Sequence, residues 1–418
     1  MTQRANWLQI LSLLIFSFIF LGGTLAVNNE LPGEWPQWRG PNRDGVSFET
    51  GLLKEWPSAG PPLVWKTQGL GNGYSTVAVS QGRLYTMGVR GDQEFILAID
   101  QKDGKLLWER AHGSRFANDR GDGPRSTPTV EGDFLYALGG NGDLSCLEIN
   151  SGKTVWTMNI LQKFDSSNIH WGISESPLIV GERLLVTPGG KNAAIVALDK
   201  KTGSVIWKSQ SDRPGYSSGV YTELGGIPEA IFFTESRALG VDVRNGNLLW
   251  EYSQASNRTA NCATPIVSGN YVFLSSDYGT GCALLALVPT EGKIKAREVY
   301  FNQEMKNHHS SSVLVEGTLY GFSSAILTAM QFNDGHVFWK DRSVGKGSLT
   351  YADGHLYCFS EKGVVGLVEA NPSAYKEKGR FSIPQETLPT WSHPVVAGGR
   401  LYLRDQDTLY SYDIKEKK

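Results

Sequence analysis

Eight positions along this 418-residue chain carry polar or aromatic side chains where a β-strand is predicted to begin. Arginine and lysine at such positions could pair with the carboxylates of a ligand, and tryptophan could stack on a flat ring. This combination is typical of a small-ligand pocket, although a solvated surface would carry the same polar residues without any ligand. Both interpretations stay open on the sequence. The eight candidates are Tyr74, Arg125, Glu175, Tyr216, Asn261, His309, Lys346 and Trp391.

Histidine and cysteine are the residues that raise the question of a metal centre. His308 and His309 are adjacent, with His393 and Trp171 expected beside the same ring of candidates. Neighbouring residues on a strand point to opposite faces, so the pair is not expected to bind one ion. We therefore predict no metal site. The four cysteines form no close-spaced haem or zinc motif and are predicted to be small core residues: Cys146, Cys262, Cys282 and Cys358.

A repeat explains how candidates so far apart in sequence would come together. Five segments share an alternating apolar strand, a polar turn that ends in glycine, and a second strand with tryptophan four residues after that glycine. Period-two patterning around a glycine turn predicts a β-hairpin. The tryptophans of these segments are Trp108, Trp156, Trp207, Trp250 and Trp339.

Two further units are degenerate. The segment "ALVPTEGKIKA" carries Ala296 where tryptophan would stand, and "ANPSAYKEKGRF" precedes a unit end at Phe381. The first strands of the units, counted separately, number eight. A fixed period with eight four-stranded units predicts a β-propeller.

The last unit lacks an outer strand, and the stretch "PPLVWKTQ" explains where that strand comes from. It carries Trp65 in a tryptophan-strand pattern, yet no repeat precedes it. A ring of blades closes by borrowing one strand from the other end of the chain, which leaves no exposed edge. Residues 61–418 are therefore predicted to be one all-β, eight-bladed propeller, closed by its N-terminal strand.

The motif Ala-x-Asp-x-x-Thr-Gly-x-x-x-Trp, complete at Ala197–Trp207, resembles the tryptophan-docking repeat of the pyrroloquinoline quinone (PQQ) propeller superfamily. The resemblance covers Leu63–Lys418. That superfamily contains quinoprotein dehydrogenases and non-catalytic members, among them the propeller lipoprotein of the outer-membrane β-barrel assembly machine. The stretch "WPQWRGPNRDGVS", Trp35–Ser47, also resembles the start of secreted PQQ-like propellers.

The resemblance implies PQQ with Ca²⁺ as a cofactor pair. Arg125 and Lys346 would pair with the quinone carboxylates, Trp391 would stack on its rings, and Glu175 with Asn261 would offer oxygen ligands to calcium. The chain departs from the quinoprotein alcohol dehydrogenases because it has no adjacent cysteines and no fused haem domain. These departures favour a non-catalytic interaction, scaffold or ligand-binding protein. The alternative is a PQQ-dependent oxidoreductase acting on an alcohol or sugar.

The N-terminal residues differ from the repeats. Arg4 precedes an apolar run that ends in small residues, so residues 1–26 are predicted to be a cleaved secretory signal, with a retained membrane anchor as the alternative. The protein is thus expected to be periplasmic or secreted. Residues 27–60, rich in tryptophan, are predicted to brace a blade or, alternatively, to bind a partner.

Charge and loop length indicate which partners to expect. A formal net charge of −2 predicts no affinity for nucleic acid. The longest predicted loops, Glu109–Arg125 and Met158–Ser174, enter the face where the polar ring lies, so they could present a surface to a protein partner. A small anionic ligand in the central funnel is the other expectation.

Overall fold

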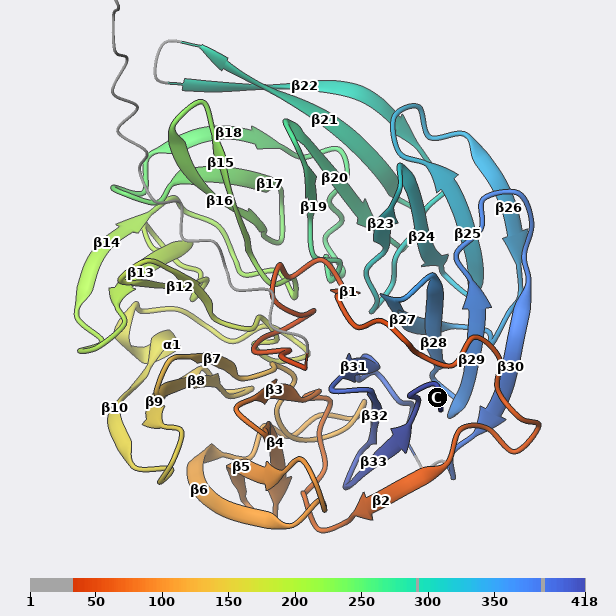
Figure 1. The fold of residues 1–418 in the computed structure, drawn as a ribbon. Helices are drawn as coiled ribbons and strands as arrows, with labels where there is room; N and C mark the ends of the chain where they lie inside the picture. The colour runs from red at the N-terminus through yellow and green to blue at the C-terminus, as the bar shows by residue number, and fades with distance from the viewer. Residues whose placement is uncertain (1–32, 291–292, 385–387, 418) are drawn as a thin grey trace, which may run out of the picture. The chain divides into compact units, whose positions relative to one another are not determined.

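The computed structural model describes residues 33–290, 293–384 and 388–417. The predicted signal at 1–26 lies outside them. Leu31–Lys418 forms one compact unit, in which eight antiparallel sheets stand around a central axis (Figure 1). Within the residues that the structure describes, no helix has the length and apolar character needed to cross a membrane. The prediction of an all-β, eight-bladed propeller is confirmed.

Each blade runs from an inner strand at the axis to an outer strand at the rim. Blade 1 contains β3 (Ala78–Ser80), β4 (Arg83–Arg90), β5 (Gln93–Asp100) and β6 (Leu106–Ser114). Blade 2 contains β7 (Thr129–Glu131), β8 (Phe134–Leu138), β9 (Asp143–Glu148) and β10 (Thr154–Asn159), followed by the short helix α1 (Ile160–Lys163). Blade 3 contains β11 (Leu178–Val180), β12 (Arg183–Val186), β13 (Ile195–Asp199) and β14 (Val205–Ser209). Blade 4 contains β15 (Val220–Leu224), β16 (Ile227–Phe233), β17 (Ala238–Asp242) and β18 (Leu248–Tyr252).

The second half of the chain repeats this order. Blade 5 contains β19 (Ile266–Ser268), β20 (Tyr271–Ser276), β21 (Gly281–Thr290) and β22 (Lys293–Asn302). Blade 6 contains β23 (Val313–Val315), β24 (Thr318–Ser323), β25 (Ile326–Gln331) and β26 (Val337–Asp341). Blade 7 contains β27 (Gly347–Ala352), β28 (His355–Ser360), β29 (Val364–Glu369) and β30 (Glu377–Ser382), with β1 (Val46–Ser47) added in parallel to β27. Blade 8 contains β31 (Val395–Ala397), β32 (Arg400–Asp405), β33 (Thr408–Asp413) and, as its outer strand, β2 (Leu63–Thr67).

Strand β2 closes the ring as the sequence predicts. It pairs antiparallel with β33, and Trp65 stands opposite Ser411. The first and the last strands of the eight blades therefore lie in one sheet, and the outer edge of β33 is covered.

The turn before each outer strand is built by an aspartate and a glycine. In blade 3, Oδ1 of Asp199 accepts hydrogen bonds from the backbone N–H groups of Lys201 (3.0 Å) and Thr202 (2.8 Å). Gly203 follows with a φ of +72°, which glycine adopts without steric cost. This local chemistry turns the chain so that the tryptophan strand returns along β13.

The docking tryptophans connect neighbouring blades. In the regular blades the indole Nε1 donates to a backbone carbonyl of the next blade, for example from Trp108 to Ile149 O at 2.9 Å. The ring also covers the turn glycine of that next blade, since a Cβ on Gly152 would lie 2.6 Å from the Trp108 ring. The same donation is made by Trp65 to Gln101, Trp156 to Lys200, Trp207 to Val243 and Trp339 to Asn371.

The docking position predicted in blade 5 is wrong. In each regular blade a β-bulge precedes the tryptophan, and in blade 5 the residue after that bulge is Tyr300, not Ala296. The hydroxyl of Tyr300 donates to Phe332 O of blade 6 at 3.0 Å. In blade 7, where the unit end is predicted near Phe381, β30 ends at Ser382 and the residue after its bulge is Gly379. The longer β21–β22 hairpin is the reason that the docking residue of blade 5 lies beyond Ala296.

The segment before β2 first lies against the inner strands of several blades and then runs outward along blade 7, from the pairing of Val46 with Tyr351 of β27 to the hydrogen bond from Trp56 N to Lys378 O of β30. Trp35 is buried and its backbone pairs with Val79 of blade 1. Trp56 is buried in the core shared by blades 7 and 8. Trp38 is half-buried, and its indole donates to Thr264 Oγ1 of the blade 5 entry loop at 2.9 Å. This segment therefore belongs to the packing of the propeller.

Candidate functional site

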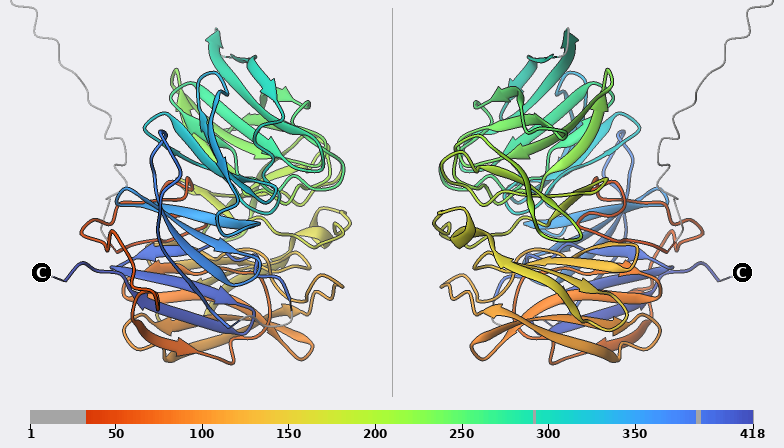
Figure 2. Two further views of the ribbon diagram at one scale, coloured as in Figure 1. Left: turned by 90° about the vertical axis from the view of Figure 1, so that its right-hand side faces the viewer. Right: turned by 90° about the vertical axis from the view of Figure 1, so that its left-hand side faces the viewer.

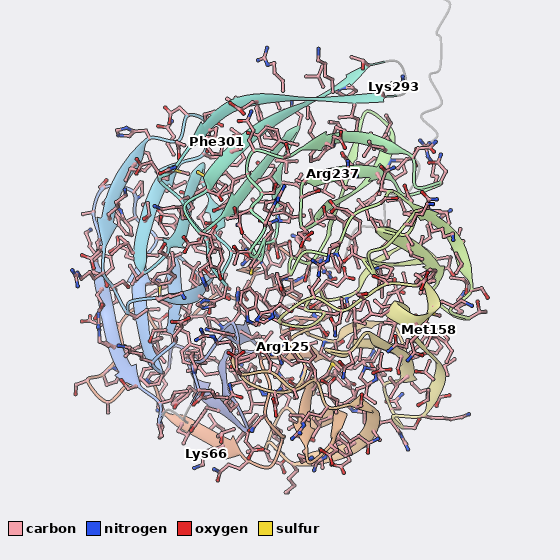
Figure 3. All side chains as sticks on the ribbon, turned by 180° about the vertical axis from the view of Figure 1, so that it is seen from behind. Lys66, Arg125, Met158, Arg237, Lys293 and Phe301 are labelled. Carbon is pink, nitrogen blue, oxygen red and sulfur yellow. The ribbon has the colours of Figure 1, made fainter. Side chains whose placement is uncertain are left out.

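A cavity of about 510 Å³ opens at the centre of the propeller, where the loops lead into the inner strands. Arg125, one of the residues in its wall, lies near the middle of the face seen in Figure 3. Volumes of this size hold small-molecule ligands. The lining residues are Trp38, Tyr74, Arg120, Arg125, Trp171, Ser174, Tyr216, Ser218, Ala260, Cys262, Tyr278, His308, His309, Lys346, Glu361, Pro389 and Trp391.

Most of the residues singled out from the sequence line this cavity together. Equivalent positions at the starts of the inner strands converge on the axis because the blades are arranged around it. Those brought together are Tyr74, Arg125, Tyr216, His309, Lys346 and Trp391, with His308 and Trp171 beside them. Glu175 and Asn261 do not line it.

Glu175 and Asn261 have structural partners instead. The carboxylate of Glu175 is buried and accepts a hydrogen bond from the backbone of Thr187, on the next strand segment of its own blade. Burial raises the pKa of Glu175 to about 7. The side-chain amide of Asn261 donates to the carbonyls of Thr234 (2.8 Å) and Glu235 (2.9 Å). Glu175 and Asn261 therefore hold backbone segments and do not bring the expected calcium ligands into the described cavity wall.

Arg125 organises the loops around the mouth. Its Nε donates to Trp171 O at 2.8 Å, Nη2 donates to Gly121 O at 2.6 Å, and Nη1 donates to Gly123 O. The guanidinium lies over the ring of Phe116, 4.5 Å from its centroid. Burial lowers the pKa of Arg125 to about 10, so the group stays cationic at neutral pH. Its positive charge faces the cavity while several of its donors hold its own loop.

Glu361 forms a second cluster, which sequence reasoning missed. Its Oε1 accepts a hydrogen bond from Trp391 Nε1 (2.7 Å) and forms an ion pair with Lys346 Nζ (3.2 Å). His309 Nδ1 lies 3.5 Å from the same oxygen. Glu361 follows β28, in the turn before β29, so a search restricted to the starts of the inner strands does not reach it. The sequence signal that could have identified it is an acidic residue in the turn between the second and third strands of blade 7.

Aromatic rings form a large part of the wall. Tyr74 and Trp391 lie with centroids 4.7 Å apart, and Trp171 and Tyr216 lie 5.5 Å apart. Tyr278 contacts His308 at 5.1 Å. Burial raises the pKa of Tyr216 to about 12, so its hydroxyl stays protonated. Such a wall offers flat apolar faces with hydroxyl, indole and imidazole groups at their edges.

The histidines of the wall are held neutral. Burial lowers the pKa of His309 well below 6.5, and the positive charge of Lys346 lowers it further. The pKa of His308 is lowered for the same two reasons. Nε2 of His309 is buried and has no hydrogen-bond partner among the described residues. A neutral imidazole with a vacant nitrogen can donate to or accept from a ligand.

Metal-binding groups are not assembled in the cavity. Among the described residues, no group of three or more histidine, cysteine, aspartate or glutamate side chains is placed to hold a metal ion. Cys262 lines the cavity as a free thiol whose pKa burial raises to about 12. The described wall therefore offers cationic, aromatic and neutral polar contacts.

Four-stranded blades with docking tryptophans around a central cavity define the PQQ-like class of β-propellers. A family profile described as "Outer membrane protein assembly factor BamB" matches residues 56–159 and 92–341, which together make up more than half of the chain. The chain belongs to that family.

Individual relatives are distant. The BamB of Moranella endobia (strain PCIT) is 24% identical over 240 residues, 57% of this chain and 58% of that protein, so the chain spans little more than half its length. A tetrathionate hydrolase of Acidithiobacillus ferrooxidans is 22% identical, covering 89% of this chain and 80% of that protein. The crystal structure of the quinohemoprotein alcohol dehydrogenase of Comamonas testosteroni is similar with a TM-score of 0.63 at 12% identity, covering 92% of this chain and 81% of that chain. At this identity the structure shows the fold alone.

Proposed function

We propose that this chain is a periplasmic or secreted, non-catalytic propeller that binds a small anionic molecule in its central cavity. The observation that carries the proposal is the wall of the cavity, in which aromatic faces surround an excess of positive charge. A ligand of this kind would place its apolar body against Tyr74 and Trp391 and its anionic group towards the cations.

The charges in the described wall favour an anion. Arg120, Arg125 and Lys346 are cationic, and Glu361 is the carboxylate that faces them. Glu361 and Lys346 form an ion pair, so these two charges largely compensate each other. The two arginines are left to attract a negative group. A relative that matches 89% of this chain is named a hydrolase of tetrathionate, which is itself a small anion.

The alternative, a PQQ-dependent oxidoreductase, has support from part of the same wall. Trp391 and Tyr74 could face a flat quinone, and the cations could pair with its carboxylates. The calcium ion is the part that does not fit, because Glu175 and Asn261 hold other backbone segments and no described acidic cluster replaces them. We therefore favour binding over redox chemistry.

A protein partner on the same face is the second part of the interaction hypothesis. The loop that contains Arg120 and the loop that contains Trp171 both reach the cavity mouth. The matching family carries the description of an assembly factor, which supports a role beside other proteins. In this form of the proposal the loops present the partner surface and the cavity lies within it.

Thermal-shift and calorimetric titration with PQQ, PQQ plus Ca²⁺, sugar acids and aryl carboxylates test the proposal. We expect at least one of these anions to bind when calcium is absent. We also expect no reduction of a redox dye when alcohols or sugars are added. Arg120 is exposed, so Arg120→Ala should leave folding unchanged and weaken binding about tenfold or more, since a charge-assisted hydrogen bond contributes about 1.5–3 kcal/mol. Arg258→Ala, an exposed arginine that does not line the cavity, is the matched control.

The outcomes separate the alternatives. Dye reduction that depends on both PQQ and calcium would support the oxidoreductase and overturn the non-catalytic proposal. If no compound shifts the melting temperature, the ligand-binding hypothesis is wrong, and the loops at the cavity mouth remain as the candidate surface for a protein partner.

A further inference from the structure

The segment that precedes β2 covers one end of the propeller axis, on the side where the C-terminus lies (Figure 2). Residues 33–47 contact the inner strands, or the loops entering them, of blades 1, 2, 3, 5, 6, 7 and 8. These contacts are Trp35 with Val79, Pro36 O with Val130 N, Arg43 with Ser176 and Pro177, Trp38 with Thr264, Arg39 with Ser311 and Ser312, Val46 with Tyr351, and Ser47 with Val396.

Trp38 is the residue of this segment that reaches the cavity. It lines the cavity, and its indole Nε1 donates to Thr264 Oγ1 at 2.9 Å. Its ring lies 4.5 Å from the ring of His393. Thr264 and His393 are both buried and neither lines the cavity. The indole thus lies between the cavity and the buried groups beyond it.

The covering segment and the loops of the mouth lie on opposite faces. In Figure 2 the red segment lies on the same side as the C-terminal label, whereas the yellow loop around α1 projects on the other side. Arg125 is seen in Figure 3 from the face opposite to that of Figure 1. Arg125 and Trp38 therefore line opposite ends of the cavity.

Two buried arginines hold Trp38 in place. Arg39 Nη2 donates to Ser312 O at 2.6 Å, and Arg43 Nη2 donates to Ser176 O at 2.7 Å. Both guanidinium groups are almost fully buried, and burial lowers the pKa of Arg39 to about 10 and that of Arg43 to about 9. Buried charged groups that lose their partners leave unsatisfied donors, so this anchorage resists displacement.

We propose that Trp38 closes the inner end of the cavity and limits the length of the ligand that the cavity accepts. The limit on ligand length rests on the proposed ligand-binding function. The closure of the cavity by Trp38 does not depend on that function. Removal of the indole would extend the cavity towards Thr264 and His393, because these groups lie directly behind it.

Probes of increasing length test the size limit. Benzoate, biphenyl-4-carboxylate and terphenyl-4-carboxylate each carry one carboxylate and differ in length, because they contain one, two and three phenyl rings. The wild-type protein should bind terphenyl-4-carboxylate at least about tenfold more weakly than biphenyl-4-carboxylate, and Trp38→Ala should remove or reverse that difference. Trp38→Phe, which keeps a ring at the end of the cavity, should keep the wild-type order. An unchanged order in Trp38→Ala would overturn the size limit.

A measurement without ligand tests the closure itself. In Thr264→Cys the new thiol lies behind Trp38, and a small methanethiosulfonate reagent should modify it slowly. Adding Trp38→Ala should accelerate modification at this site at least about tenfold, with peptide mapping to separate it from Cys262. Trp38→Leu replaces Trp38→Ala if the latter fails to fold. Equal rates with and without the indole would overturn the closure, whereas failure of all probes to bind either protein would overturn the ligand-binding function and its size limit.

Discussion

The junction between blades 1 and 2 differs from that between blades 7 and 8 in where its indole comes from. Trp108 belongs to blade 1 itself and lies 6.1 Å from Tyr85 of the same blade. In blade 7 the equivalent position is Gly379, and the indole beside Tyr357, at 5.9 Å, is Trp56 from the segment before β2. A Cβ on Gly379 would lie 2.5 Å from Cβ of Trp56, so glycine makes room for the incoming residue.

In both blades an indole packs beside a tyrosine of the second strand, although the two indoles come from different parts of the chain. The two indoles also differ in hydrogen bonding. Trp108 Nε1 donates to Ile149 O, whereas Trp56 Nε1 is buried without a partner among the described residues. Trp56 therefore contributes through packing, and Trp108 contributes through packing and a hydrogen bond.

The largest expected effect comes from removing Trp56. Trp56→Ala should lower the free energy of unfolding by about 3–5 kcal/mol, as Trp108→Ala should, because the Trp56 indole is buried in a core and the Trp108 indole packs, partly buried, against another. Chemical denaturation monitored by far-ultraviolet circular dichroism measures both. Phe338→Ala, at a position 40% exposed on an outer strand, is the control and should change stability by less than about 0.5 kcal/mol. A cost for Trp56→Ala as small as that control would break the equivalence of the two junctions.

A smaller effect, dependent on pH, is expected at the junction between blades 4 and 5. Trp250 Nε1 donates to the Glu229 carboxylate of its own blade, and not to a carbonyl of the next blade. Burial raises the pKa of Glu229 from 4.5 to about 7. A raised folded-state pKa gives stability that is complete below pH 4.5 and is lost as pH rises through 7. The stability of the wild type should therefore fall across that window.

Replacement of Glu229 isolates this contribution. Glu229→Gln keeps an oxygen acceptor for Trp250 and cannot ionise, so it should remove about 2–3 kcal/mol of the decline between pH 4.5 and pH 8. Denaturant titrations at several pH values measure it. Glu94 and Glu175 are also buried with pKa values raised to about 7, so part of the decline should persist. An identical decline in Glu229→Gln would show that this carboxyl does not ionise in the folded protein.

The smallest effect is expected at Tyr300, which takes the docking position in blade 5. Tyr300→Phe removes the hydroxyl that donates to Phe332 O and should cost about 0.5–1.5 kcal/mol. Tyr357→Phe provides the matched comparison, since that hydroxyl is buried without a partner among the described residues, and its loss should be neutral or stabilising. Differential scanning calorimetry of the two variants side by side checks the ranking. The reverse ranking would contradict the assignment of Tyr300 as a docking residue.

Most of the fold could be predicted because it depends on local patterns. The blades are predicted by the alternation of apolar residues in the strands, by the Asp–Gly turn and by the recurring tryptophan. The closing strand is predicted because Trp65 has the tryptophan-strand pattern but no repeat precedes it. The position of a β-bulge depends on how two strands pair, which alternation does not reveal. For that reason Tyr300 was not recognised, and Trp56 was not connected with Gly379.

The candidate site was predictable only in part. Reading the strand starts finds Tyr74, Arg125 and Trp391 because the propeller brings those positions to the axis. It also finds Glu175, whose side chain turns towards a neighbouring segment of the same blade. Glu361 and Trp38 reach the cavity from a turn and from the segment before β2, and their positions depend on long-range packing that no single repeat encodes.

The pairing of β2 with β33 also has a consequence for biosynthesis. β2 is synthesised before any of the complete blades, and its partner β33 is synthesised after all the others. At about 5–20 residues per second, β2 waits on the order of tens of seconds for that partner. Its side chains Leu63 and Val64 are apolar, and an unpaired strand of this kind invites pairing with other chains. A ribosome that stalls before Thr408 therefore leaves an open ring with an unpaired, apolar strand at its start, so β2 stays open to pairing with other chains until β33 has been made.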